Sequence, residues 1–346
     1  METSNKMAYV RSREKAKNYV GIDSLFAILV DGEDSGDRFS VIEIVAGQGA
    51  AMPWHQHLDQ DETFYVLDGE VEFDVADQSF KAVKGSFISI PKGIGHRFEV
   101  KSESARILNS FYPAGFEKLI VEHFPEQGSF GAGIGTYQAD WSEIAARDNG
   151  DFTLLNGEVA ENAFLGKIQP YMHHRETSPA LWNLGILWVV MANSENTGGS
   201  HSFIDELIPH GPSASPHIHQ RAQEIFYILD GEMTFFAGDE WEPVTAKANS
   251  LVVVPEGTQH AFKVDSPTVH LVNIYTPAGF EYIIEGNAVP ATAMTLQPKN
   301  MPPKEHDNTA DIFEVIGKKY PGALTKRILP EDVHNETVTN VFHLKN

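Results

Sequence analysis

The sequence predicts an all-β protein made of two tandem domains of similar structure. Two features of the chain lead to this prediction. First, short runs of strand-forming residues such as SLFAILV, RFSVIEIV and HRFEV follow one another at close spacing, separated by glycine or aspartate turns. Second, long blocks of sequence occur twice in the same order, as the duplication of a whole domain would produce.

The first repeated block contains a candidate metal site. It reads GAAMPWHQHLDQDETFYVLDG and places His55, His57 and Glu62 between two glycines. Successive side chains of a strand point to opposite faces, so two histidines two residues apart leave the same face. A short turn and the return strand TFYVL would bring Glu62 back beside both imidazoles. A fourth ligand is expected at His96, which follows the Pro/Gly turn of GSFISIPKGIGH.

The second repeated block contains the same constellation at the same intervals. Its members are His217, His219, Glu224 and His260. A single HxH pair is more often a surface feature, but two complete copies favour metal binding. Imidazole nitrogens and a carboxylate suit a divalent transition metal, with Fe, Mn, Co, Ni or Cu at least as well matched as Zn. The sequence therefore predicts one such metal in each domain and leaves its identity open.

These blocks resemble the two motifs of the cupin superfamily, G(x)5HxH(x)3-4E(x)6G and G(x)5PxG(x)2H(x)3N. The second copy of motif 2 begins with Asn249 in place of Gly, and both copies end at valine, Val100 and Val264, in place of Asn. None of these three positions is a metal ligand, and Asn tolerates a left-handed backbone best after Gly. The resemblance covers nearly the whole chain and implies a bicupin, with jelly-roll β-barrel domains and short helical extensions.

Within the superfamily the chain is most similar to bacterial bicupin quercetin 2,3-dioxygenases and their pirin-adjacent relatives. Four residues separate the second histidine from the glutamate, as in those enzymes, whereas oxalate decarboxylases have the three-residue form. The expected boundaries are 1–127 for the N-terminal cupin domain and 170–295 for the C-terminal one. A linker with one helix is expected at 128–169, and an extension with another helix at 296–346.

Strand alternation also predicts which aromatic side chains point into each barrel with the ligands. The candidate substrate-pocket residues are Phe64, Phe98, Phe226 and Phe262. Such a lining suits a flat, aromatic or uncharged small molecule, although for any one of these residues a place in the ordinary core is the favoured alternative. Arginine is scarce on the predicted inward face, which counts against oxalate or another small dicarboxylate.

The resemblance implies a metal-dependent dioxygenase that inserts O2 into an enolic or phenolic aromatic substrate. Glu62 and Glu224 would then be catalytic as well as metal ligands, each taking the proton of a substrate hydroxyl. One alternative is a non-oxidative cupin enzyme, such as an isomerase, lyase or decarboxylase. Another is a non-catalytic bicupin that binds a metal or a ligand, and a third is a protein with one active half.

Composition excludes several classes of protein. The 346 residues are 42% hydrophobic and 21% charged, which is enough to fill two cores. A net charge of -22 argues against nucleic acid and anionic membrane as partners, and the absence of cysteine excludes disulfides and thiolate ligands. No signal peptide or membrane-spanning segment is evident, so a cytoplasmic protein is the default expectation. Exposed sheet edges make a homodimer a further expectation.

Overall fold

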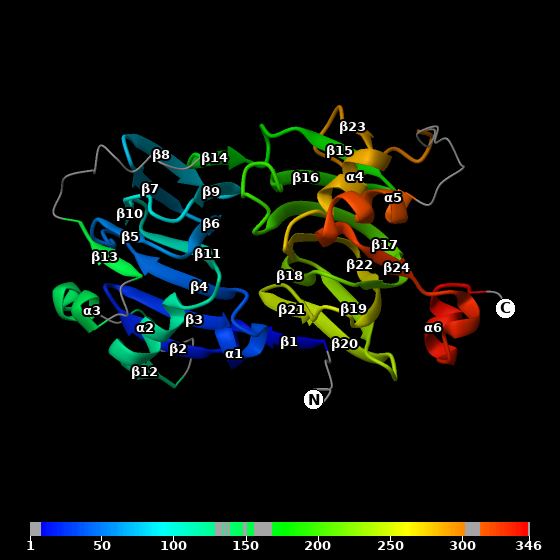
Figure 1. Ribbon diagram of the computed structural model, residues 1–346, viewed down its shortest axis with the longest axis horizontal. Coiled ribbons are helices and arrows are strands. Elements are labelled where there is room, and N and C mark those ends of the chain that lie inside the picture. Colours follow the sequence, from blue (N-terminus) through cyan, green and yellow to red (C-terminus); the bar gives the residue numbers. More distant parts are fainter. Residues whose placement is uncertain are drawn as a thin grey trace. The chain divides into compact units, whose positions relative to one another are not determined.

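The computed structural model describes residues 8–128, 134, 137, 139–147, 151–155, 168–301 and 312–344. The chain divides into two compact units, Ser12–Thr177 and Met1–Arg11 with Ser178–Asn346 (Figure 1). We call them the N-terminal and the C-terminal barrel. Both consist mainly of antiparallel strands with a few short helices, so the predicted all-β class is confirmed.

The N-terminal barrel has two sheets that pack face to face. The larger has the strand order β12-β2-β3-β4-β11-β6-β9-β14, and the smaller has the order β13-β5-β10-β7-β8. Their inward faces enclose one apolar core, as expected for a jelly roll. The strands are β2 (Lys17–Gly21), β3 (Ser24–Val30), β4 (Ser40–Gly47), β5 (His55–His57), β6 (Asp61–Asp68), β7 (Glu70–Val75), β8 (Gln78–Val83), β9 (Ser86–Ile90), β10 (His96–Val100), β11 (Ser104–Tyr112), β12 (Glu126–Gln127), β13 (Phe152–Leu154) and β14 (Tyr171–His174).

In the C-terminal barrel two 18-residue strands, β17 (Ser202–His219) and β22 (Gln259–Thr276), continue through both layers. By the sequence repeat, β17 corresponds to β4 plus β5, and β22 to β10 plus β11. All strands of this barrel therefore belong to one hydrogen-bonded sheet. The others are β1 (Tyr9–Ser12), β15 (Ala180–Asn183), β16 (Ile186–Ala192), β18 (Gln223–Asp230), β19 (Glu232–Ala237), β20 (Glu242–Lys247), β21 (Ser250–Val254), β23 (Val289–Pro290) and β24 (Thr325–Arg327).

Short helices flank both barrels, and a repeated glutamate explains why the sequence repeat extends beyond the metal motifs. Glu117 is buried near the start of α2, and its carboxylate accepts the backbone N–H of Gly32 at 3.1 Å. Glu281 begins α4 and accepts the N–H of Ser194 at 2.7 Å. Each helix start is thereby tied to a turn of its own barrel. The helices are α1 (Gly32–Ser35), α2 (Phe116–His123), α3 (Trp141–Arg147), α4 (Glu281–Asn287), α5 (Ile312–Lys319) and α6 (Glu336–Val341), with 3-10 turns η1 (Arg13–Lys15), η3 (Pro321–Ala323) and η4 (Pro330–Asp332).

The departure from the cupin motif at Asn249 has a backbone cause. Gly85 has φ 88° in the N-terminal barrel, and Asn249 has φ 67° at the corresponding position. Both values lie in the left-handed region, which Gly adopts freely and Asn adopts at lower cost than most other residues. The motif therefore requires a backbone conformation at this position, and asparagine meets that requirement.

Strand pairing alters the domain limits expected from the sequence. The prediction placed residues 170–177 in the C-terminal domain, but β14 pairs with β9 of the N-terminal barrel. Residues 152–154 of the expected linker form β13, which pairs with β5. The extension 296–346 supplies β24, which pairs with β17. A sequence pattern shows that a segment can be a strand, but the free sheet edge decides where it pairs.

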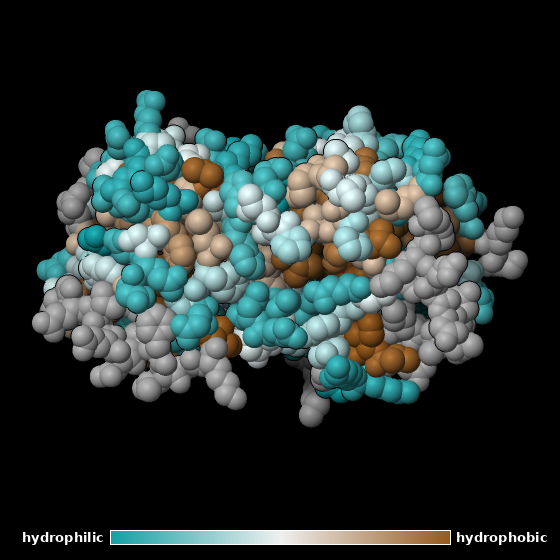
Figure 2. All heavy atoms as spheres, turned by 90° about the horizontal axis from the view of Figure 1, so that it is seen from above, coloured by the Kyte–Doolittle hydropathy of each residue, from teal (hydrophilic) through white to brown (hydrophobic). Residues whose placement is uncertain are grey.

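The surface is predominantly hydrophilic on the face that Figure 2 shows, with apolar residues in smaller groups. This distribution agrees with the net charge of -22. Among the helices that the structure describes, none has the length and apolar character needed to span a membrane.

Candidate metal centres

The structure gathers the eight predicted ligands into two clusters of four. In each cluster the ligand atoms of three histidines and one glutamate all lie within 4.8 Å of one another. The members of the first are His55, His57, Glu62 and His96, and those of the second are His217, His219, Glu224 and His260.

Strand geometry accounts for this convergence. In the N-terminal barrel His55 pairs with His96 across β5 and β10, which brings the first and last ligand of the set together. In the C-terminal barrel His217 pairs with His260 across β17 and β22. The HxH spacing places the second histidine of each pair on the same face. The glutamates come from β6 and β18, which belong to the same barrels.

Hydrogen bonds at Nδ1 determine the tautomer of most of these histidines. In four of the six, Nδ1 lies 2.8 to 3.0 Å from the backbone carbonyl oxygen two residues earlier in the chain. A carbonyl only accepts, so Nδ1 must carry the proton and Nε2 keeps a free lone pair. The four pairs are His55 with Pro53, His96 with Ile94, His217 with Ser215, and His260 with Thr258.

The inner atoms of the N-terminal cluster lack hydrogen bonds of their own. Nε2 of His57, Nε2 of His96 and Oε2 of Glu62 are buried and have no hydrogen-bond partner. Oε2 of Glu62 nevertheless lies 2.7 Å from Nε2 of His96 and 3.5 Å from Nε2 of His57. Buried polar atoms that converge in this way are costly unless a cation satisfies them. The donor set fits a divalent transition metal.

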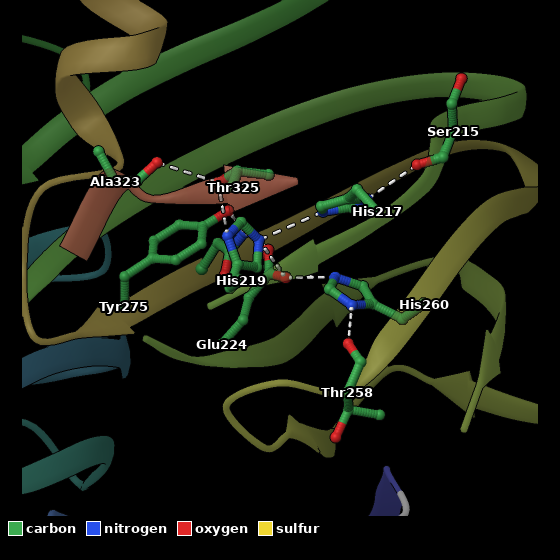
Figure 3. A network of polar contacts seen from close by, with 10 residues as sticks. Ser215, His217, His219, Glu224, Thr258, His260, Tyr275, Ala323 and Thr325 are labelled. Carbon is green, nitrogen blue, oxygen red and sulfur yellow. Dashed lines mark hydrogen bonds and ion pairs between the residues drawn. The ribbon is translucent and has the colours of Figure 1, made fainter. Parts of the chain in front are cut away.

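The same convergence occurs in the C-terminal cluster (Figure 3). Oε2 of Glu224 lies 2.9 Å from Nε2 of His260 and 3.2 Å from Nε2 of His219. Three of the four ligands are buried, whereas His217 is partly exposed. All four N-terminal ligands are buried. The C-terminal centre is therefore the more accessible of the two at its ligands.

Electrostatics favour the protonation states that a metal requires. Burial, together with His96 and His57, lowers the pKa of His55 well below its ordinary value. Burial alone would raise the pKa of Glu62, but the same two histidines outweigh it and lower that pKa. The pKa of Glu224 is also well below its ordinary value, because His219 and His260 outweigh the effect of burial. Neutral imidazole and ionised carboxylate are the metal-binding forms.

The remaining histidine of each set is oriented by a residue from outside the core of the barrel. Nδ1 of His57 lies 3.2 Å from Oδ2 of Asp151, the residue that precedes β13. Nδ1 of His219 lies 3.0 Å from Oγ1 of Thr325, the first residue of β24. Neither contact was predicted, because neither residue is part of a repeated block. The N-terminal imidazole is thus paired with a carboxylate, and the C-terminal one with a hydroxyl.

Aromatic rings surround the second histidine of each motif. The ring of His57 lies 5.3 Å from that of Phe111 and 5.1 Å from that of Phe116. The ring of His219 lies 5.3 Å from Tyr275 and 5.1 Å from Phe280. These neighbours were not predicted, although the repeated segments FYPAGFE and YTPAGFE contain all four.

The four phenylalanines predicted to line the pockets are buried in the cores of their barrels. In each barrel, the two predicted phenylalanines pack around a third phenylalanine from the strand that follows in the sequence, β7 or β19. Phe64 and Phe98 have ring centroids 4.9 and 5.8 Å from Phe73, and Phe226 and Phe262 lie 4.9 and 5.6 Å from Phe235.

The two glutamates differ in how their outer oxygen is held. Oε1 of Glu62 accepts the amide of Asn109 at 2.9 Å. Oε1 of Glu224 accepts the amide of Asn273 at 3.0 Å and also the hydroxyl of Tyr275 at 2.6 Å (Figure 3). The N-terminal barrel has a phenylalanine, Phe111, where the C-terminal one has this tyrosine.

The fold and both ligand sets define a bicupin. The family model of the cupin domain matches residues 41–111 and again 203–275. The chain therefore carries two cupin domains and belongs to the cupin superfamily.

Among curated proteins the chain is similar to the quercetin 2,3-dioxygenase of Bacillus subtilis (strain 168). The two are 24% identical over 293 residues, which is 80% of this chain and 84% of that enzyme. This chain is also 32% identical over 111 residues to the uncharacterized protein YdbB of the same organism. The match covers 96% of that protein and 30% of this chain.

Solved structures of Bacillus subtilis oxalate decarboxylase have the same fold. The structure at pH 4.6 aligns with a TM-score of 0.54 at 16% identity, covering 80% of this chain and 78% of the enzyme. A structure from a study of the Mn(II) centres of that enzyme aligns with a TM-score of 0.56 at 14% identity, covering 80% and 79%. At these identities the likeness concerns the fold alone.

Proposed function

We propose that the protein is a metal-dependent dioxygenase of the quercetin 2,3-dioxygenase type, which inserts O2 into an enolic or phenolic aromatic substrate. The observation that carries this proposal is the duplicated cluster of three histidines and one glutamate, whose inner atoms converge inside an apolar barrel. The similarity to the Bacillus subtilis enzyme over most of both chains supports it. Flavonols are the substrate class to test first.

A divalent transition metal (Fe, Mn, Co, Ni or Cu), one in each barrel, would supply Lewis acidity toward a substrate hydroxyl and a redox centre for O2. The histidines would hold the metal through Nε2, because their Nδ1 atoms are engaged elsewhere. The proton of the substrate hydroxyl would pass to Oε2 of Glu62 or Glu224. Oε1 of each glutamate is already engaged by an asparagine, so Oε2 is the oxygen that remains to act as the base.

The rings around each centre would select the substrate and limit access of water. Phe111 and Phe116 beside His57, and Tyr275 and Phe280 beside His219, give both centres an aromatic boundary. Such a boundary suits the flat ring system of a flavonol and lowers the local dielectric constant. The phenylalanine clusters that include Phe64, Phe98, Phe226 and Phe262 would form the apolar floor of the pockets. A homodimer stays a prediction from the sequence.

Oxygen uptake with quercetin, in protein loaded separately with Fe, Mn, Co, Ni and Cu, tests the proposal. We expect metal-dependent uptake that the double variant Glu62→Gln/Glu224→Gln abolishes. The exposed Glu242 provides a control for the type of exchange, since Glu242→Gln makes the same substitution once, on the surface strand β20. Absence of uptake with every metal, in protein that binds about two metals per chain, would reject the dioxygenase and favour a non-oxidative or ligand-binding bicupin.

A further inference from the structure

An edge strand of the N-terminal barrel places an aromatic side chain against the candidate metal ligands. β13 pairs with β5 so that Phe152 lies opposite His57 and Leu154 lies opposite His55. Residues that are directly opposite in an antiparallel pair project from the same face of the sheet. Phe152 and Leu154 therefore point to the same side as the two imidazoles. Phe152 belongs to the apolar core of the barrel, and Leu154 packs against that core.

The ring of Phe152 covers the N-terminal cluster beside its first two histidines. Its centroid lies 5.1 Å from that of His55 and 5.8 Å from that of His57. The same ring lies 5.7 Å from that of Trp141 on α3, and only 2% of Phe152 is exposed. Apolar rings thus fill the space beside both imidazoles, and all four ligands of this cluster are buried.

Backbone hydrogen bonds hold the segment that carries Phe152 at both ends. The carbonyl oxygen of Asp151 accepts the N–H of Leu58 at 3.0 Å. At the other end, the N–H of Leu155 donates to the carbonyl oxygen of Trp54 at 2.9 Å. Because the backbone is held at these points, the ring of Phe152 can leave the ligands only by rotation of its side chain. The rings packed around it restrict that rotation.

The equivalent edge strand of the C-terminal barrel leaves its cluster more open on this side. β24 pairs with β17, which places Thr325 opposite His219 and Arg327 opposite His217. Thr325 is a small residue whose hydroxyl contacts His219, and Arg327 is exposed (Figure 3). His217 is itself partly exposed, and its ring lies against those of the ligands His219 and His260. The same edge pairing therefore carries a large ring in one barrel and a small side chain in the other.

We propose that Phe152 limits access to the N-terminal centre by size. Small ligands such as O2 reach the metal there, whereas an aromatic substrate reaches it only after the ring of Phe152 has turned away from His55. At the C-terminal centre Thr325 leaves the same approach open to an aromatic ring. The inference rests on the metal centres of the proposed function and not on its reaction. It means that the two centres select ligands of different size although their ligand sets are the same.

Binding of two probes to the full chain loaded with Co(II) tests the proposal. Azide is the small probe and catechol the aromatic one, and the visible absorption of Co(II) reports the entry of either into its coordination sphere. A His219→Ala background retains the N-terminal centre, and the measurements are made without oxygen so that no oxidation takes place. In this background Phe152→Ala should lower the Kd of catechol about tenfold, the order expected for removal of a steric obstacle, and keep that of azide within about twofold.

The C-terminal centre provides the control. In a His57→Ala background, which retains that centre, Phe152→Ala should change neither Kd. In the same background Thr325→Phe should weaken catechol binding more than azide binding.

An unchanged Kd of catechol in Phe152→Ala at the N-terminal centre, or equal changes for catechol and azide, would overturn the proposal. If Phe152→Ala does not fold or loses its metal, Phe152→Leu decides, since leucine removes the ring and stays apolar. Turnover is not measured, so failure of the dioxygenase assay leaves this test intact.

Discussion

The two candidate metal centres have the same four predicted ligands in the same order, yet their surroundings differ. In the N-terminal barrel the second histidine is backed by the carboxylate of Asp151, and the glutamate has one donor, Asn109. In the C-terminal barrel the second histidine is backed by the hydroxyl of Thr325, and the glutamate has two donors. Duplication has thus preserved the ligands, while the groups around them have diverged.

This contrast indicates a division of properties between the barrels. An imidazole that donates to a carboxylate is a more basic ligand, so the N-terminal centre should hold its metal more tightly. A glutamate with one donor is less restrained, so Glu62 should also be the better base. The C-terminal glutamate is fixed by Asn273 and Tyr275 and should act mainly as a ligand. Substitutions at matching positions of the two barrels test this difference.

The largest expected effect is the loss of one metal per chain. His57→Ala and His219→Ala each remove a nitrogen from a different cluster, and each should lower the bound metal by about one equivalent, because a structural ligand set tolerates few losses. Elemental analysis after dialysis measures this. The half-buried His123 on α2 lies outside both clusters, and His123→Ala serves as a control that should keep both metals. Loss of both metals in either ligand variant would show that the centres depend on each other.

The next effect concerns the pH dependence of stability in metal-free protein. The pKa of Glu206, a buried residue of β17, is raised in the folded protein. Well below the ordinary value of 4.5, Glu206 is protonated in both the folded and the unfolded protein, and its contribution to the free energy of unfolding is fully present. As pH rises above that value the unfolded chain releases the proton while the folded one keeps it, and the free energy of unfolding falls. The fall is at most about 1.4 kcal/mol per pH unit until the folded pKa is reached.

Urea unfolding of wild type and Glu206→Gln, compared at several pH values, checks this sign. Stability of the variant relative to wild type should increase steadily as the pH is raised above 4.5. All other titrating groups are common to both proteins, so their contributions cancel in the difference. A difference that stays constant with pH would show that Glu206 ionises in the folded protein as readily as in the unfolded chain.

A smaller effect is expected from the hydroxyl that only the C-terminal barrel possesses. Tyr275→Phe removes a 2.6 Å hydrogen bond to Glu224 and should destabilise the metal-free protein by about 2 kcal/mol, the order expected for a bond to a charged group. The midpoint of urea unfolding measures the loss. Phe111 occupies the matching position in the N-terminal barrel. The reciprocal exchange, Phe111→Tyr, should not weaken the N-terminal centre. Equal effects of the two exchanges would remove the distinction between the glutamates.

The sequence predicted the fold class and the clustering of the candidate ligands, because both depend on strand periodicity. His55, His57 and Glu62 recur at fixed intervals in the second block, and alternation then places them on one face. The repeat also contained Phe116 and Phe280, whose role beside the histidines only the structure made visible.

Other parts of the site could not be predicted, because they arise from segments that do not repeat or from differences within the repeat. Asp151 and Thr325 reach the histidines only through the pairing of β13 and β24 with sheet edges, which no local pattern encodes. Glu206 sits at a position where periodicity predicts an apolar residue, as Ile44 at the matching position of β4 shows. The pairing of β14 with β9 of the N-terminal barrel could not be predicted for the same reason as the pairing of β13 and β24, because it too depends on a free sheet edge.

The smallest predicted effect compares the two residues that orient the histidines. Asp151→Asn keeps the size of the side chain but removes the negative charge that faces Nδ1 of His57, and should weaken N-terminal metal binding about tenfold. Thr325→Val removes only a neutral acceptor from His219, and the change should be about two- to threefold, because neutral hydrogen bonds are weaker than charge-assisted ones. Competition with a metal-binding dye, in backgrounds that retain one centre, measures both. If Thr325→Val costs as much as Asp151→Asn, the carboxylate confers no additional affinity, and the difference in metal binding between the barrels must come from the glutamates and their donors.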